Sequence, residues 1–141
     1  MQRLLGLDIG ERRIGVALSD PLGITAQRLT IIERQGVAQD LSAIAELVTT
    51  HQVEAVIVGL PLTMRGETGE QAKLVQALAE QLAARISCPI RFIDERLTTA
   101  QSERALLETD TSRKRRKGLI DQLAAQLILQ SYLDGHTPHA S

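Results

Sequence analysis

Aromatic side chains are almost absent from this sequence, which has one Phe, one Tyr and no Trp in 141 residues. The hydrophobic residues, 43% of the chain, must therefore build the core from Leu, Ile, Val and Ala. The same scarcity excludes a nucleic-acid surface on which successive bases stack against aromatic rings.

Cysteine is equally scarce, with Cys88 alone in the chain. One cysteine excludes an intrachain disulfide, and the sequence has no Cys and His cluster with the spacing of zinc ligands. We interpret Cys88 as an inert structural residue. His136 and His139 fall in the final segment GHTPHAS, where we expect a flexible tail over 137–141 rather than metal ligands.

Long hydrophobic runs are missing as well. No apolar stretch approaches the roughly 18 residues of a membrane-spanning helix, and the N-terminus lacks the charged-then-apolar pattern of a secretory signal. We therefore expect a cytoplasmic protein with no membrane partner. The net charge of −1 excludes a uniformly basic coat, but it leaves room for a local basic patch that binds phosphates.

The first third of the chain contains three strand-like segments joined by short polar connections. They cover residues 3–9, 12–20 and 24–33, and the third follows the turn signal DPLG at 20–23. Segments spaced so closely predict an antiparallel three-strand meander.

The remainder alternates between helical periodicity and continuous apolar runs. The pattern predicts, in chain order, a helix over 37–50, a strand over 53–60, a helix over 68–86, a strand over 89–95, a helix from Thr98 or Thr99 to about 107, a basic loop, and a helix over about 119–134. The order β-β-β-α-β-α-β-α-α predicts one α/β domain over 1–136. Its mixed five-stranded sheet would combine the meander with two parallel crossover strands, flanked by helices.

Three carboxylates occupy positions that this fold would bring to one edge of the sheet. Asp8 lies near the end of the first strand, in LLGLDIG, and Glu95 ends the fifth. Asp121 lies in the first turn of the last helix, beside the small residues Ala124 and Ala125. If the strands run parallel, Asp8 and Glu95 emerge at the same edge, where open α/β sheets usually bind ligands.

Carboxylates gathered in this way repel one another unless a cation compensates their charge. Mg²⁺ suits oxygen ligands, and a pair of such ions about 3.5–4 Å apart can activate water and stabilise the leaving oxygen in phosphodiester cleavage. A purely structural interpretation stays open. Asp8 could cap the turn, Glu95 could pair with Arg91 or Arg96, and Asp121 is favoured near a helix N-terminus by the dipole alone.

The helix that carries Asp121 follows five consecutive cations: Arg113, Lys114, Arg115, Arg116 and Lys117. We expect sequence-independent, salt-sensitive phosphate contacts from this run, above all from Lys117, one helical turn before Asp121. Arg96 beside Glu95 and Arg13 in the first turn are further candidates. The alternative is a solvated loop, which is what most charge runs are.

Four segments in this order extend over nearly the whole chain: LLGLDIGERRIGVALSD, VIVGLPLTMRGETGEQA, FIDERLTTAQSERAL and RKGLIDQLAAQLILQSYL. Together they resemble the YqgF/RuvX family of ribonuclease H-like nucleases. The resemblance implies the ribonuclease H-like sheet and places the family's acidic residues on Asp8, Glu95 and Asp121. It also implies a Mg²⁺- or Mn²⁺-dependent nuclease of the bacterial cytoplasm that matures the 5′ end of the 16S ribosomal RNA precursor, or alternatively resolves Holliday junctions.

The chain departs from the family pattern in two places. Arg65 stands in the loop 61–70 where members often have Asn or Asp. No fourth acid is evident, because Asp94 alternates to the opposite face from Glu95 and Asp20 ends the second strand far from the expected edge.

Two other functional classes fit parts of the sequence. The sugar-kinase, actin and Hsp70 ATPases also read D-x-G between two strands, although they need two such lobes around the nucleotide. A non-catalytic ribosomal RNA-binding assembly factor would use the basic run alone. The sequence leaves open whether the nucleic acid is structured RNA or branched DNA, and whether the protein is a monomer or a homodimer.

Overall fold

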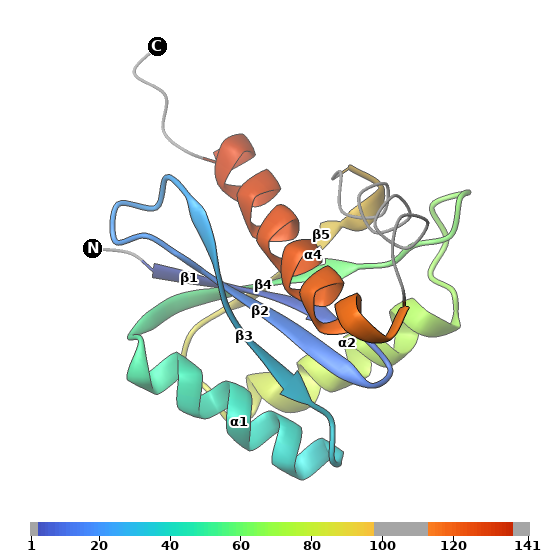
Figure 1. The fold of residues 1–141 in the computed structure, drawn as a ribbon, viewed down its shortest axis with the longest axis horizontal. Helices are drawn as coiled ribbons and strands as arrows, with labels where there is room; N and C mark the ends of the chain where they lie inside the picture. The colour runs from blue at the N-terminus through green and yellow to red at the C-terminus, as the bar shows by residue number, and fades with distance from the viewer. Residues whose placement is uncertain (1–2, 98–112, 137–141) are drawn as a thin grey trace.

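The computed structural model describes the backbone of residues 3–97 and 113–136 and the side chains of 3–96 and 123–135. Its elements are β1 (Arg3–Ile9), β2 (Arg13–Ser19), β3 (Ala26–Glu33), α1 (Val37–Thr50), β4 (Val53–Leu60), α2 (Glu70–Ala83), β5 (Ile90–Asp94), the 3₁₀ helix η1 (Glu95–Leu97) and α4 (Arg113–His136). Figure 1 shows α1 and α2 on one side of the sheet and α4 across the other. None of the described helices has the length and apolarity needed to cross a membrane.

The sheet has the strand order β3-β2-β1-β4-β5. β1 pairs antiparallel with β2, and β2 antiparallel with β3, so these three strands form the predicted meander. β4 pairs parallel with β1, and β5 parallel with β4. The predicted mixed five-stranded sheet is confirmed, and its central strand is the one that carries Asp8.

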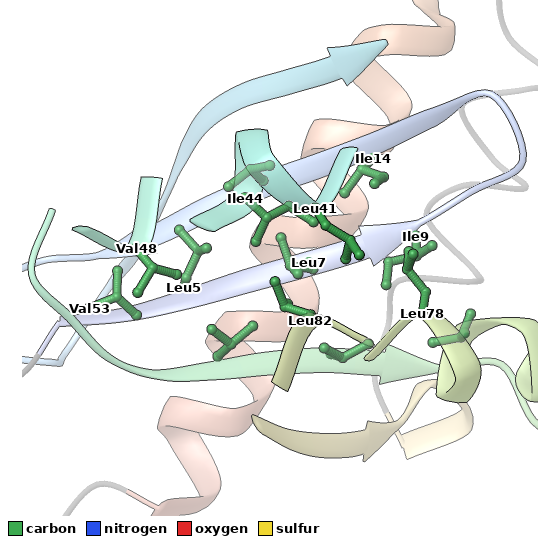
Figure 2. Close-up of a cluster of buried hydrophobic side chains, with 14 of the residues drawn as sticks. Leu5, Leu7, Ile9, Ile14, Leu41, Ile44, Val48, Val53, Leu78 and Leu82 are labelled. Carbon is green, nitrogen blue, oxygen red and sulfur yellow. The ribbon is translucent and has the colours of Figure 1, made fainter. Parts of the chain in front are cut away.

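The larger core lies between the sheet and the two helices α1 and α2. Leu5 and Leu7 of β1 alternate onto this face and meet Leu41 and Ile44 of α1, as Figure 2 shows. All four are at most 1% exposed. Each side chain of this size contributes about 1.5–3 kcal/mol when it leaves water, so aliphatic residues hold this layer together without aromatic rings.

The opposite face of the sheet receives α4 at close range. A Cβ atom on Gly6 would lie 2.7 Å from Leu129 Cβ, so the absence of a side chain lets the helix approach β1. Gln130 fixes the helix to the start of β3, because its Oε1 accepts from Ala26 N at 2.9 Å. Arg91 of the edge strand β5 donates from Nη1 to Tyr132 Oη at 2.8 Å. α4 is thus attached to both edge strands of the sheet.

The last helix differs from the prediction. α4 begins at Arg113, so the expected basic loop is wrong and the five cations form the first turns of the helix. Arg and Lys are good helix formers, and the single Gly118 costs only about 1 kcal/mol, which a 24-residue helix packed on the sheet tolerates. Glu95 opens η1 rather than ending β5. The predicted helix to about 107 and the tail 137–141 lie outside the described residues.

Candidate active site

Asp8 lies on the α4 face of β1, one residue before the strand ends. Leu5 and Leu7 face α1, and because successive side chains alternate along a strand, Gly6 and Asp8 face α4. Asp8 is 7% exposed although it is ionisable. A polar residue in this central strand is therefore held at the interface between sheet and helix.

Glu95 lies on the same α4 face of the sheet as Asp8, but it follows β5, which is separated from β1 by β4. It directly follows β5, whose Ile93 pairs with Gly59 and packs in the cluster around α4. A Cβ on Gly59 would lie 3.1 Å from Glu95 Cγ, so the Glu95 side chain extends over Gly59. Only 2% of Glu95 is exposed.

Gly59 separates the two acids. Leu7 pairs with Val58, so the next residues, Asp8 and Gly59, lie level in the parallel ladder. Two strand spacings put the backbones of β1 and β5 about 10 Å apart, and the bare glycine leaves the surface between them free of a β4 side chain. The structure thus brings Asp8 and Glu95 together at the carboxyl edge of the parallel strands, on the face covered by α4.

The third predicted acid, Asp121, belongs to α4, and its side chain lies outside the described residues. Ala125 O approaches within 3.2 Å of the position of a Cβ on Gly6, whereas Gln130 lies near the start of β3, at the opposite edge. One helical turn before Ala125, the backbone is displaced by about 5.4 Å toward the edge that holds Asp8. The turn containing Asp121 is therefore directed to the correct edge, and its role as a ligand stays a prediction.

The donor chemistry of the edge fits a hard cation. Two carboxylates withdrawn from water are unfavourable unless something compensates their charge. Oxygen donors of this kind suit Mg²⁺ and Mn²⁺. Within the described side chains no group of three His, Cys, Asp or Glu could hold a metal ion, so these two carboxylates are the candidate protein ligands there, and waters or substrate phosphates can complete the shell of such a cation.

Arg96 lies beside Glu95 but binds Asp94. Its Nη2 donates to Asp94 Oδ2 at 2.7 Å, and its backbone N donates to Oδ1 at 2.9 Å. The side-chain hydrogen bond from Arg96 lowers the pKa of Asp94 below its ordinary value, and the same bond raises the pKa of Arg96. Asp94 is thus engaged in an ion pair that flanks Glu95.

The remaining predicted residues lie in different surroundings. Asp20 accepts from the backbone N–H groups of Ile24 and Thr25, both at 2.7 Å, at the turn before β3, and the Thr25 bond is the main cause of its lowered pKa. Arg13 pairs with Glu33 across β2 and β3, at 2.8 Å from Nε to Oε1. The first turns of α4 contain five of the predicted phosphate ligands, whose side chains are outside the described residues: Arg113, Lys114, Arg115, Arg116 and Lys117.

Sequence reasoning missed an ion pair between Arg34 and the buried Asp40, next to the turn that follows Asp8. Arg34 donates from Nε to Asp40 Oδ2 at 2.9 Å and from Nη1 to the carbonyl of Gly10 at 3.0 Å. Asp40 is 1% exposed. The available signal was the position of Asp40 in the first turn of α1, directly before the core residue Leu41, which indicates a buried acid that needs a partner. Its partner could not be identified because Arg34 lies in the connection between β3 and α1, where no periodic pattern fixes the direction of a side chain.

A model of the RuvX family, described as Holliday junction resolvase, matches residues 2–135. A proposed pre-16S rRNA nuclease of Moorella thermoacetica is 55% identical over 132 residues, covering 94% of both chains. One from Syntrophomonas wolfei is 52% identical over 133 residues, again 94% of both. Among solved structures, Thermus thermophilus RuvC in complex with a Holliday junction is similar with a TM-score of 0.60 at 17% identity, over 97% of this chain and 98% of that one. This likeness shows a common ribonuclease H-like fold.

Proposed function

The chain belongs to the RuvX family, and we propose that it is a metal-dependent nuclease that hydrolyses phosphodiester bonds at the edge formed by Asp8 and Glu95. The observation that carries this proposal is the placement of two buried carboxylates on either side of Gly59. Buried ionisable groups gathered at one edge of a sheet are typical of functional sites, and two carboxylates suit a cation-binding site.

Asp8, Glu95 and Asp121 would hold Mg²⁺ or Mn²⁺ through their carboxylate oxygens. A bound ion of this kind supplies an activated water and stabilises charge on the leaving oxygen. The chain itself provides position. β1 fixes Asp8 in the central strand of the sheet, η1 turns Glu95 over Gly59, and both carboxylates lie largely withdrawn from water on the face that α4 crosses.

Phosphates of the substrate would be bound by cations around this edge. Arg113, Lys114, Arg115, Arg116 and Lys117 open the helix that crosses β1, so the run leads toward the carboxylates. Arg96 and Arg13 are secondary candidates, since each already has an acidic partner. Contacts of this type position a strand without reading its bases.

The favoured substrate is the 16S ribosomal RNA precursor, which the names of the similar proteins specify, and the family resemblance of the sequence implies its 5′ end. A substrate of this kind would place the protein in the cytoplasm. A four-way DNA junction is the second candidate, supported by the description of the family and by the similar junction resolvases. Symmetric cutting of a junction would require a two-fold dimer, whereas trimming an RNA end is compatible with a monomer.

Side-by-side cleavage tests the proposal. The purified protein would be mixed with a 5′-labelled RNA precursor fragment and with a labelled four-way DNA junction, in Mn²⁺, in Mg²⁺ and in EDTA. We expect metal-dependent cleavage that Asp8→Asn and Glu95→Gln each abolish. Glu54→Gln serves as the matched control, because Glu54 is an exposed carboxylate on β4 away from the edge. Binding without cleavage of either substrate would leave the non-catalytic assembly factor as the correct class.

A further inference from the structure

The β4–α2 loop, residues 61–69, projects from the sheet next to η1 (Figure 1). It closes on itself through Thr63, whose backbone N donates to Glu67 O at 2.9 Å and whose carbonyl accepts from Gly66 N at 2.8 Å. The Thr63 hydroxyl accepts from Glu67 N at 3.1 Å. Gly66 has φ of 83°, which only glycine adopts without strain. The loop is therefore a folded turn with a defined tip at Met64 and Arg65.

This turn is attached to the residue that follows Glu95. The Arg96 guanidinium lies against Gly66, where a Cβ would be 3.0 Å from Nη2. Arg96 Nη1 also donates to the carbonyl of Met64 at 3.5 Å, a long contact. Since Asp94 holds Arg96 through three side-chain hydrogen bonds, the position of the turn is fixed relative to both neighbours of Glu95.

The tip presents one apolar and one cationic side chain to solvent. Met64 is 96% exposed, compared with 74% for Leu22 at the turn before β3. Arg65 is exposed beside it. A single exposed apolar side chain is common on protein surfaces and marks no site by itself. What distinguishes Met64 is that a hydrogen-bonded turn holds it next to the carboxylate edge, with Arg65 and Arg96 around it.

We propose that the β4–α2 loop binds an unstacked base next to the phosphate that is cut, with Met64 against the base and Arg65 on an adjacent phosphate. The inference rests on the proposed nuclease function and extends it to the form of the substrate. Apolar side chains, Met among them, insert between bases where proteins open nucleic acid. In a chain with one Phe and one Tyr, Met64 offers a flexible, polarizable thioether that can contact an aromatic base.

A consequence follows for substrate choice. A base can leave the stack at low cost in a single-stranded flank, at a mismatch or at a branch point, but only at higher cost inside a continuous duplex. The protein should therefore favour nucleic acid with an unpaired nucleotide beside the cutting position. Positive charge favours this partner over a protein, because Arg65 follows Met64 on the tip and the Arg96 guanidinium contacts the Met64 carbonyl.

The binding test uses the full chain in EDTA, so that no cleavage occurs. Two fluorescein-labelled RNA hairpins share one stem; the first has an unpaired 5′ flank with 2-aminopurine at its first unpaired position, and the second has this flank fully paired. We expect Met64→Ala to weaken binding of the flanked RNA about three- to tenfold, less than loss of an aromatic stacking partner would. Binding of the paired RNA should not change, and Met64→Leu should retain affinity. The 2-aminopurine emission should rise on binding to the wild type and not to Met64→Ala.

Leu22→Ala is the matched control, because Leu22 is also an exposed apolar residue at a turn but lies at the other end of the sheet. It should bind both RNAs as the wild type does. The proposal is overturned if Met64→Ala leaves binding of the flanked RNA unchanged, or weakens both RNAs equally.

Cleavage assays distinguish a failure of the loop proposal from a failure of the proposed nuclease function. If the wild type cuts in a Glu95-dependent manner while Met64→Ala keeps the same kcat/KM on flanked RNA, the loop proposal is wrong and the nuclease stands. If Met64-dependent binding is found but no metal ion produces cleavage, the nuclease proposal is wrong and the loop remains a binding element for unpaired bases.

Discussion

The guanidinium of Arg34 and the carboxylate of Asp40 form an ion pair, at 2.9 Å from Nε to Oδ2, next to the turn that follows Asp8. Asp40 is buried, and its other oxygen accepts from Gln35 N at 3.1 Å. Arg34 also donates to the Gly10 carbonyl at 3.0 Å. The pair therefore connects the start of α1 to the chain two residues beyond Asp8.

Arg34→Ala should destabilise the protein strongly. The substitution leaves Asp40 as a buried carboxylate without its cation, and removing one partner from such a pair costs about 3 kcal/mol. The comparison is Arg13→Ala, whose partner Glu33 is 65% exposed and whose loss should cost about 0–1 kcal/mol. Free energies of unfolding from urea titration measure both variants. Equal losses would contradict the special role of the buried pair.

Acid should weaken the attachment beside Glu95. The hydrogen bond from Arg96 holds the folded-state pKa of Asp94 below its ordinary value of 3.8. The stabilisation is therefore fully present above that ordinary value and is lost as pH falls through the lowered one. Thermal unfolding of wild type and Asp94→Asn between pH 7 and pH 2 tests this. We expect the difference in midpoint to be constant near neutrality and to vanish at the acid end, whereas a constant difference throughout would refute the linkage.

Cys88 should react slowly with alkylating reagents in the folded protein. Burial raises the pKa of its thiol above the ordinary 9.0, and only the thiolate is nucleophilic. Iodoacetamide labelling at pH 8, followed by mass spectrometry, should be several-fold slower in buffer than in urea, where the chain unfolds and the ordinary pKa returns. Cys88→Ser gives the background of labelling at other residues. Equal rates in buffer and in urea would show that the thiol is accessible and unperturbed.

The sheet could be predicted from the sequence because strand alternation and short polar turns are local signals. The strands predicted over 12–20 and 24–33 span Arg13–Ser19 and Ala26–Glu33, an error of at most two residues at each end. The start of α4 could not be predicted so well. Five like charges followed by Gly118 indicate a loop, but the same residues have good helix propensity and continue the helix that packs on β1.

For the candidate site, the parallel order of the strands predicted that Asp8 and Glu95 emerge at one edge of the sheet, and β1, β4 and β5 do run parallel. This order could not reveal Gly59 as the residue that gives Glu95 its space, since this depends on the pairing register of β4 with β5. In the sequence, Gly59 and the turn after it are equally compatible with a loop that approaches a phosphate. A glycine at the end of a strand rich in valine is also typical of close packing, which is its role here.

Gly59→Ala should remove activity with a moderate loss of stability. The added Cβ would lie 2.5 Å from Ile128 Cδ1 and 3.1 Å from Glu95 Cγ, so both neighbours must move. Overpacking of this kind costs about 1–3 kcal/mol. Displacement of Glu95 should lower kcat far more than the remaining folded fraction explains. Urea unfolding and cleavage rates on the same preparations separate the two effects.

A second substitution identifies which contact matters. Ile128→Val removes the Cδ1 atom that the methyl group added by Gly59→Ala would contact at 2.5 Å. Because α4 can then return to its original position, the double variant should recover part of the lost free energy of unfolding. Because the contact with Glu95 Cγ persists, activity should not recover in parallel. Gly135→Ala, which meets nothing within 4 Å, is the control for adding a methyl group elsewhere in the chain. If the double variant regains stability and activity together, the role of Gly59 is to let α4 pack closely on the sheet. The space that Gly59 leaves for the Glu95 side chain would then have no separate effect on catalysis.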